Sequence, residues 1–267
     1  MTQTSHAGGK MLASAEDGIG TITFNQPEKR NAVSVEMWGG LGKILQGFAA
    51  DPAIRVVVLT GAGDRAFVSG ADISQFEQQR GNAAARAEYE ARTQAGRDIF
   101  ENFAKPTIAR IQGFCIGGGL AIAMSCDLRI ASDDSRFGIP AARLGISYGY
   151  GSVRRLVSLV GSAEARLLLY TGDHIPAAEA RQIGLINKVV SAAELDATVT
   201  RIARTITANA PLSVVSMKMT VTEAAKDTAD ADRAAIDASI AGCFDSADYR
   251  EGRRAFMEKR RPVFTGT

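Results

Sequence analysis

Residues 111–120 read Ile-Gln-Gly-Phe-Cys-Ile-Gly-Gly-Gly-Leu, and an apolar segment with helical character continues from there to Ser125. The three consecutive glycines, residues 117–119, stand directly before this helix. Without side chains they leave backbone N–H groups open to a ligand, and the helix N-terminus adds a partial positive charge. The pattern indicates a site for an oxyanion. The alternative is that the glycines serve only close packing of the helix against a strand.

A nucleotide phosphate is a weaker interpretation of the same glycines. The run lacks the Lys-Ser or Lys-Thr ending of a P-loop. It also lacks the Gly-x-Gly-x-x-Gly spacing that is followed by an acidic residue in dinucleotide-binding proteins. We therefore retain the oxyanion interpretation.

The glycine-rich segment 113–119 predicts a turn, and strand and helix patterns alternate on both sides of it. Residues 107–111 before it and residues 128–131 after it predict strands. Nearer the N-terminus, residues 55–60 predict a buried strand of β-branched residues, and Ser34 precedes a helix with one apolar face. Residues 75–103 predict a polar, solvated helix. This succession predicts an α/β fold.

The composition excludes several classes of protein. Of the 267 residues, 46% are apolar and 22% are charged, as in ordinary folded domains. The net charge of +2 gives no indication of nucleic-acid binding. No run approaches the roughly 18 apolar residues of a membrane helix, and the first residues lack the apolar core of a secretory signal. Three cysteines and two histidines suggest neither a disulfide framework nor a metal site, so we expect a cytoplasmic protein without a bound metal.

The character of the chain changes near residues 200–210. Residues 211–260 are rich in alanine, methionine and charged residues, with helical periodicity and no strand pattern. We therefore expect a flexible tail over residues 1–10, an α/β core over residues 11–205 and a helical region over residues 206–267. A helical extension of this size rarely covers its own apolar face, which favours an oligomer interface.

Six landmarks follow one another between about Ala13 and Phe264. They are residues 25–31, 67–73, 117–119, 126–127, 177–185 and 249–261. In this order they resemble the enoyl-CoA hydratase/isomerase superfamily, also called the crotonase family. The resemblance implies a crotonase-like spiral of ββα units followed by a C-terminal helical trimerisation domain. It also implies a homotrimer or a dimer of trimers.

The resemblance further implies a ligand, an acyl-CoA thioester, with coenzyme A as part of the substrate and no separate cofactor. By position, the backbone N–H groups of Ala71 and Gly118 would form an oxyanion hole for the thioester oxygen. One such donor is worth roughly 10²–10³ in rate. The implied contacts to CoA are Lys29, Arg30, Ala32, Ala71, Asp72 and Ile73, together with Phe256 and Lys259 for the CoA of a neighbouring subunit.

The charged members of this set also have a simpler interpretation. Lys29, Arg30 and Lys259 suit solvated surface positions, and Asp72 suits the cap of a following helix. Without the resemblance, the surface interpretation of these basic residues is the favoured one.

The sequence departs from the family at the positions of its acids and bases. Family hydratases carry one glutamate two residues after the triple glycine and another after a Phe-Gly-x-Pro segment. Here these positions are Ala121 and Ala141, and the acid position of the family isomerases is Gly149. Hydration needs a base to activate water and an acid to protonate Cα, each worth roughly 10²–10⁴ in rate. The sequence therefore disfavours ordinary hydratase chemistry.

Tyr148 is the leading candidate among the protic side chains of this turn. Its position is similar to that of a tyrosine in the methylmalonyl-CoA decarboxylase branch, although that branch has histidine at Ala71 and glutamate at Ala121. Loss of CO₂ from a malonyl-type thioester needs no base, only a dry pocket and enolate stabilisation. We therefore favour lyase chemistry, with Tyr148 binding the carboxylate or returning a proton. The alternative for Tyr148 is a hydrogen bond to a backbone carbonyl.

Two other functions fit the same residues. One is a non-catalytic acyl-CoA-binding protein that kept the pocket and lost the acids. The other is a hydratase or isomerase whose acid and base stand at unrecognised positions. No motif in the sequence indicates the length of the acyl chain.

Overall fold

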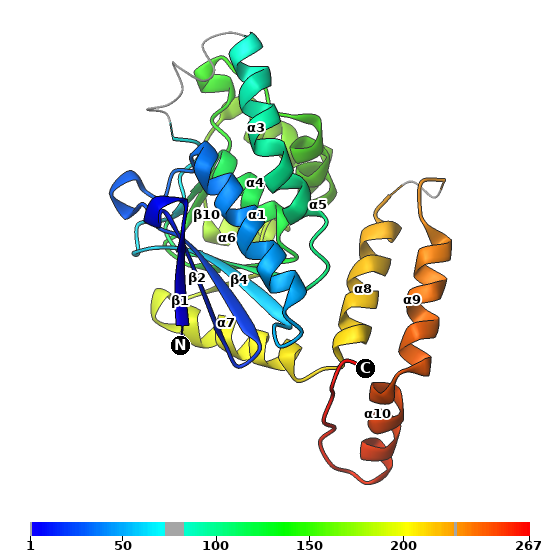
Figure 1. Cartoon of the computed structure of the whole chain (residues 1–267). Helices are drawn as coiled ribbons and strands as arrows, with labels where there is room; N and C mark the ends of the chain where they lie inside the picture. The colour runs from blue at the N-terminus through cyan, green and yellow to red at the C-terminus, as the bar shows by residue number, and fades with distance from the viewer. Residues whose placement is uncertain (1, 73–82, 227–228) are drawn as a thin grey trace.

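The computed structural model describes residues 2–72, 83–226 and 229–267, whose strands form two sheets (Figure 1). In spatial order, the larger sheet contains β1 (Thr2–His6), β2 (Met11–Glu16), β3 (Ile19–Phe24), β4 (Val56–Gly61), β6 (Thr107–Ile111), β8 (Leu128–Ser132) and β11 (Lys188–Val190). The smaller sheet contains β10 (Ile175–Pro176), β9 (Arg136–Gly138), β7 (Phe114–Ile116) and β5 (Ala66–Val68).

Successive turns of the chain repeat one unit of two strands followed by a helix. The first strand joins the larger sheet and the second joins the smaller sheet. In this way β4 and β5 precede α3 (Ala83–Glu101), β6 and β7 precede α4 (Gly118–Ser125), and β8 and β9 precede α5 (Tyr150–Thr171). The first strands pair in parallel with one another, and so do the second strands. The α/β spiral of ββα units predicted from the sequence is confirmed.

The larger sheet is buried on both faces, which explains the unbroken apolar sequence of β4. Val57 and Leu59 belong to the core that includes α1 (Val35–Ala50). On the opposite face, Val56 and Val58 pack against α7 (Ala192–Thr207). A strand covered on both sides needs apolar residues at every position, not at alternate ones.

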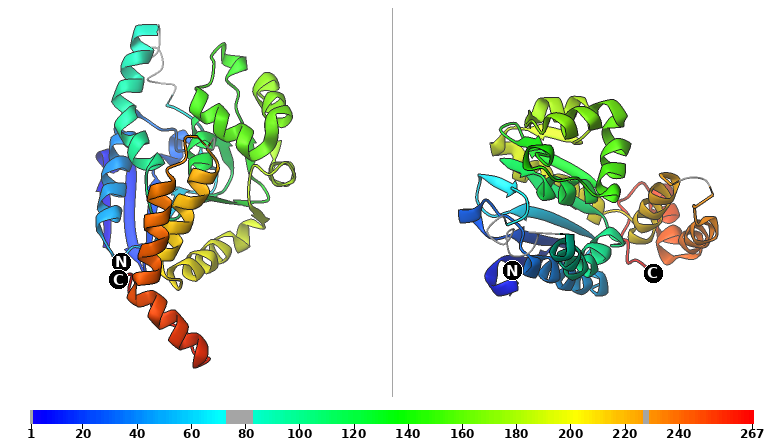
Figure 2. Two further views of the ribbon diagram at one scale, coloured as in Figure 1. Left: turned by 90° about the vertical axis from the view of Figure 1, so that its right-hand side faces the viewer. Right: turned by 90° about the horizontal axis from the view of Figure 1, so that it is seen from above.

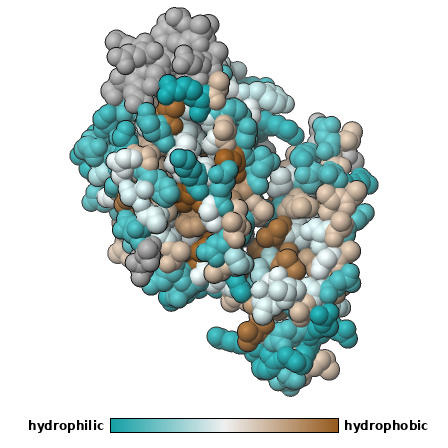
Figure 3. All heavy atoms as spheres, viewed as in Figure 1, coloured by the Kyte–Doolittle hydropathy of each residue, from teal (hydrophilic) through white to brown (hydrophobic). Residues whose placement is uncertain are grey.

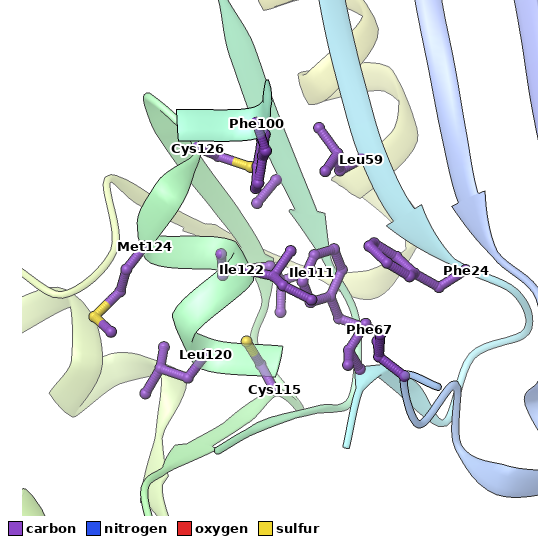
Figure 4. Packing of buried hydrophobic residues seen from close by; sticks show 14 of the residues in the cluster. Phe24, Leu59, Phe67, Phe100, Ile111, Cys115, Leu120, Ile122, Met124 and Cys126 are labelled. Atoms are coloured by element: carbon purple, nitrogen blue, oxygen red, sulfur yellow. The ribbon is translucent and has the colours of Figure 1, made fainter. Parts of the chain in front are cut away.

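The core between the two sheets contains aromatic side chains and two cysteines. Figure 4 shows Phe24, Phe67 and Ile111 close together beside α4, and the two phenylalanine rings meet edge to face with centroids 5.8 Å apart. Cys115 and Cys126 are also buried there. Burial raises the pKa of the Cys126 thiol to about 12, so this side chain is a neutral packing group.

Residues 1–10 differ from the flexible tail expected from the sequence. Residues 2–6 form β1, which runs antiparallel to β2 with Thr2 opposite Ala15 and His6 opposite Met11. The segment Thr-Gln-Thr-Ser-His has no apolar face. Its pairing therefore depends on backbone hydrogen bonds at the sheet edge, which no hydrophobic pattern reports.

The helices from Pro211 onward stand to one side of the core in Figure 1 and in the right-hand view of Figure 2. They are α8 (Pro211–Ala224), α9 (Arg233–Asp245) and α10 (Ala247–Met257). Figure 3 shows hydrophobic residues on the side of this region that faces the core. An apolar surface of this kind suits an oligomer interface, and the trimerisation role stays a prediction. The large apolar side chains exposed anywhere on these three helices include Met217, Val221, Phe244, Phe256 and Met257.

Two negative findings hold for the part of the chain that the structure describes. None of its helices has the length and apolarity needed to cross a membrane. It also contains no cluster of three or more His, Cys, Asp and Glu side chains arranged to hold a metal ion.

Asn31 joins the start of β5 to the turn that precedes α1. Its side chain is fully buried, and its backbone has a positive φ of 57°. The side-chain amide donates hydrogen bonds to the carbonyl oxygens of Ala66 (2.7 Å) and Ala62 (3.0 Å). The side-chain oxygen accepts a hydrogen bond from the backbone N–H of Gln26 at 3.0 Å. One side chain thus satisfies three backbone groups.

We predict that Asn31→Ala lowers the free energy of unfolding by about 3 kcal/mol, because an unsatisfied buried polar group costs roughly 1–3 kcal/mol. Urea denaturation measures this loss. Asn102→Ala is the matched control, since its amide also donates to a backbone carbonyl, that of Asp98, but on the exposed surface. For this variant we expect a change below about 0.5 kcal/mol. Similar losses in the two variants would contradict the role given to Asn31.

Candidate functional site

The three glycines before α4 have three different physical roles. Gly117 has φ 53° and ψ −118°, a conformation that favours glycine. At Gly119, an added Cβ would lie 2.0 Å from the carbonyl oxygen of Val68, so the close approach of α4 to β5 requires the absence of a side chain. At Gly118, an added Cβ would meet the backbone nitrogen of Ala71 at an ordinary 3.6 Å. Packing alone therefore explains Gly119, whereas Gly118 lies beside the backbone of Ala71 without a contact close enough to exclude a side chain.

The backbone N–H groups of Ala71 and Gly118 are the two donors at this contact. Val33 pairs with the loop after β5, donating to the carbonyl of Gly70 at 2.8 Å and accepting from Asp72 at 3.1 Å. This pairing does not use the N–H of Ala71. Gly118 is the first residue of α4, and the N–H groups of the first helical turn have no partner within the helix. Within the described residues, neither N–H donates to a backbone carbonyl. Two adjacent amide donors at a helix N-terminus can stabilise an oxyanion.

The loop that carries Ala71 is held by residues 29–33. The ammonium group of Lys29 contacts the carboxylate of Asp72 at 2.8 Å, and that carboxylate is only 7% exposed. The backbone N–H of Ser69 donates to the carbonyl of Arg30 at 3.1 Å. These contacts fix the backbone on both sides of Ala71, so the first two sequence landmarks meet at this loop.

The predicted CoA contacts divide into groups. Lys29, Ala32 and Asp72 lie beside the Ala71 loop, where Lys29 has an acidic partner and Ala32 is buried. The guanidinium of Arg30 lies over the ring of Phe114, 5.2 Å from its centroid. Ile73 lies outside the described residues. The helix that Asp72 was expected to cap would begin in the same segment, so that expectation also lies outside them. Binding of CoA by this set stays a prediction.

Phe256 and Lys259 belong to the other end of the molecule. Phe256 lies in α10 with its side chain 83% exposed, and Lys259 follows that helix. Within one chain, the structure does not bring them to the Ala71 and Gly118 donors (Figure 1). Their contact with the CoA of a neighbouring subunit stays a prediction.

Tyr148 reaches the site from the turn before α5. Its hydroxyl donates a hydrogen bond to the carbonyl oxygen of Gly117 at 2.7 Å. This is the backbone-carbonyl partner that the sequence left as an alternative. Burial raises the pKa of the phenol above its ordinary value, so the group is neutral. Carboxylate binding or proton return by Tyr148 stays a prediction, and either requires this proton to leave Gly117.

The three positions where the sequence lacks the acids of the family carry a methyl group or no side chain. Ala121 stands one helical turn after Gly118 in α4, Ala141 is buried in the core that contains α4, and Gly149 is exposed. The carboxyl groups of Glu36, Glu194, Glu223 and Glu251 have a lowered pKa, the opposite of the rise that a general acid at neutral pH needs.

Arg97 is a charged group near this site that the sequence did not single out. It lies in α3, with its guanidinium carbon 5.0 Å from the centroid of the Trp38 ring. Its Nε is buried and has no hydrogen-bond partner among the described residues. Its positive charge lowers the pKa of Tyr148, against the effect of burial, which places the guanidinium within electrostatic reach of the phenol. A single arginine in a polar helix belongs to no sequence motif, so its buried position is known only from the fold.

Comparison with known proteins gives a consistent result. The family model described as enoyl-CoA hydratase/isomerase matches residues 14–267. A crotonyl-CoA hydratase of Syntrophomonas wolfei is 39% identical over 256 residues, which cover 95% of this chain and 97% of that protein. A short-chain-enoyl-CoA hydratase of Clostridium acetobutylicum is 36% identical over 254 residues, covering 94% of this chain and 95% of the relative.

Solved structures agree with the sequence relatives. An enoyl-CoA hydratase/carnithine racemase from Magnetospirillum magneticum superimposes with a TM-score of 0.90 at 34% identity, over 97% of this chain and 96% of that one. An enoyl-CoA hydratase from Bacillus anthracis gives a TM-score of 0.89 at 30% identity, over 97% of this chain and 100% of that one. The chain belongs to the enoyl-CoA hydratase/isomerase family, as the landmarks in its sequence predicted.

The different roles of two neighbouring glycines give a paired prediction. Gly119→Ala lowers the free energy of unfolding by about 1–3 kcal/mol, because the new methyl group overlaps the Val68 carbonyl and forces α4 away from β5. Gly118→Ala leaves stability unchanged or raises it slightly, since alanine favours the helix and meets only ordinary contacts. Thermal unfolding compares them. A more damaging Gly118→Ala would contradict this assignment.

Proposed function

We propose that this protein is an enzyme that acts on an acyl-CoA thioester through an enolate held by the N–H groups of Ala71 and Gly118. The observation that carries the proposal is the placement of these two donors side by side at the N-terminus of α4. Membership of the family, and similarity to proteins named as CoA hydratases, support a CoA thioester as the substrate.

We propose decarboxylation of a malonyl-type thioester as the reaction. The bond between Cα and the carboxylate carbon breaks, and its electron pair moves into the thioester to form an enolate. The enolate oxygen accepts hydrogen bonds from Ala71 and Gly118, CO₂ leaves, and Cα then takes a proton from water. This sequence of steps needs no general base. It fits a site in which Ala121 and Ala141 stand at the family's acid–base positions.

Arg97 supports a substrate with a carboxylate on its acyl group. A buried guanidinium nitrogen without a partner is costly unless a ligand satisfies it. Arginine donors match carboxylate geometry, and hydrogen bonds of this type are stronger than neutral ones. The absence of carboxylate side chains at Ala121 and Ala141 also avoids repulsion of an anionic acyl group.

Hydration of an enoyl-CoA is the second candidate. The names of the relatives from Syntrophomonas wolfei and Clostridium acetobutylicum favour it. In this chain, hydration requires an acid and a base from positions other than Ala121, Ala141 and Gly149.

Mass spectrometry of a mixed CoA-thioester panel, incubated with excess protein, tests the proposal. The panel contains crotonyl-, malonyl-, methylmalonyl- and longer enoyl-CoA. We expect loss of CO₂ from a malonyl-type member and no addition of water to the enoyl members. Addition of water to crotonyl-CoA without decarboxylation would overturn the proposed reaction. If CoA thioesters raise the melting temperature but none is converted, the protein is a binder and the proposal of an enzyme is wrong.

Gly118→Pro tests the oxyanion hole itself. Proline removes the N–H donor, yet the first position of a helix is where proline is best tolerated. We expect the rate of decarboxylation to fall by roughly 10²–10³, the value of one oxyanion-hole donor. Ala192→Pro, at the first position of the exposed α7 N-terminus, is the matched control and should leave the rate unchanged. A fully active Gly118→Pro variant would exclude this N–H as a donor.

Arg97→Gln tests recognition of the carboxylate. We expect KM for the carboxylated thioester to rise about tenfold or more, because a hydrogen bond to a charged group contributes about 1.5–3 kcal/mol. Binding of butyryl-CoA, whose acyl group carries no charge, should not change when measured by calorimetry. Arg92→Gln, at an exposed position of α3, serves as the control. If Arg97→Gln weakens the binding of both ligands equally, Arg97 shapes the pocket but does not recognise the carboxylate.

A further inference from the structure

The peptide unit between Gly117 and Gly118 has one end in the oxyanion hole and the other end bound by protein. Its N–H end is the Gly118 donor. Its C=O end accepts two hydrogen bonds, one from the hydroxyl of Tyr148 at 2.7 Å and one from the N–H of Ala121 at 3.0 Å. The preceding N–H, that of Gly117, donates to the carbonyl of Gly138 at 2.8 Å. The amide that serves the hole is thus anchored on its carbonyl side.

A hydrogen bond to a peptide carbonyl changes the N–H of the same peptide. Resonance makes the amide planar and couples the two ends, which point in opposite directions in a trans peptide. Drawing electron density toward the oxygen leaves the N–H more positive, so chains of hydrogen bonds strengthen one another by roughly 10–30% per bond. The Tyr148 hydroxyl therefore acts on the Gly118 donor through one amide group.

Orientation is the second consequence of the same contact. The peptide is flanked by Gly117 and Gly118, which have no side chains to restrict their backbone, and Gly117 already has a positive φ. An amide in such a segment can rotate unless its polar ends are tied. The rigid ring of Tyr148, packed against the core, ties the carbonyl end and so fixes where the N–H points.

We propose that Tyr148 is a positioning residue that orients and polarises the Gly117–Gly118 amide, so that the Gly118 N–H binds the thioester oxygen more strongly. This inference rests on the oxyanion hole of the proposed function. It assigns to Tyr148 an action through Gly118, with no contact between the phenol and the reacting carbon. The neutral state that burial imposes on the phenol keeps its proton available to the Gly117 carbonyl.

The carbonyl stretching frequency of a bound thioester tests this inference directly. The probe is butyryl-CoA labelled with ¹³C at the thioester carbon, which has neither a double bond nor a carboxylate to react. In the wild-type protein we expect the frequency to fall on binding, because both N–H donors polarise the carbonyl. Tyr148→Phe should reverse part of this shift. Tyr150→Phe, which removes the hydroxyl of a residue that is 81% exposed at the start of α5, is the control and should not change it.

Kinetics give a second readout. Since one donor is worth roughly 10²–10³ in rate and the phenol modifies that donor by roughly 10–30%, Tyr148→Phe should lower kcat about two- to tenfold. KM should change little, because hydrogen bonds to the thioester oxygen gain most of their strength as negative charge develops in the transition state. A rise in KM for carboxylated thioesters alone would show that the phenol binds the substrate carboxylate, which would overturn the positioning role.

A graded substitution separates polarisation from packing. Tyr148→3,5-difluorotyrosine retains the ring and gives a stronger hydroxyl donor when measured near pH 6, where the phenol is neutral. We expect a larger carbonyl shift than in the wild-type protein, with an unchanged melting temperature. If Tyr148→Phe and the fluorinated variant both give the wild-type frequency, the inference is wrong. If the wild-type protein itself causes no shift in bound butyryl-CoA, the oxyanion hole of the proposed function is wrong instead.

Discussion

The close approach of α4 to β5 is the constraint on which the rest of the site depends. Gly119 lies so near the Val68 carbonyl that no side chain fits, and this contact brings the N-terminus of α4 against the loop after β5. The same loop is held from the other side by Val33 and by the ion pair between Lys29 and Asp72. Two backbone donors from distant parts of the sequence are therefore held together by packing, backbone hydrogen bonds and one ion pair.

The chemistry of this site follows from dipoles more than from titrating groups. Peptide N–H groups keep their charge distribution at every pH, and burial leaves Tyr148 neutral. The charge of Arg97, in α3, acts on the pKa of Tyr148 against the effect of burial. Such an arrangement stabilises negative charge as it develops but offers little capacity to move protons. Chemistry that proceeds through an enolate without a general base suits it better than chemistry that needs two carboxyl groups.

Much of the fold could be predicted because its signals are local. The β-branched run of β4 and the strand–glycine–helix pattern around α4 each specify an element by themselves. The strands of the smaller sheet could not be predicted in this way. β7, for example, falls inside the glycine-rich segment that predicted only a turn, because three residues are too few for a hydrophobic period and their pairing partners are far away in sequence. The edge strand β1 was not predicted because it pairs through backbone hydrogen bonds, which leave no hydrophobic pattern in the sequence.

The sequence by itself determined the family, the glycines before α4 and the alanines at the family's acid–base positions, because these are properties of residue identity and spacing. Only the tertiary structure decided what each group faces. It placed the Gly118 N–H beside Ala71, directed the Tyr148 hydroxyl to the carbonyl of Gly117, and brought Arg97 over the ring of Trp38. Hydrogen-bond partners depend on distances of a few tenths of an ångström between segments that the chain brings together only when it folds.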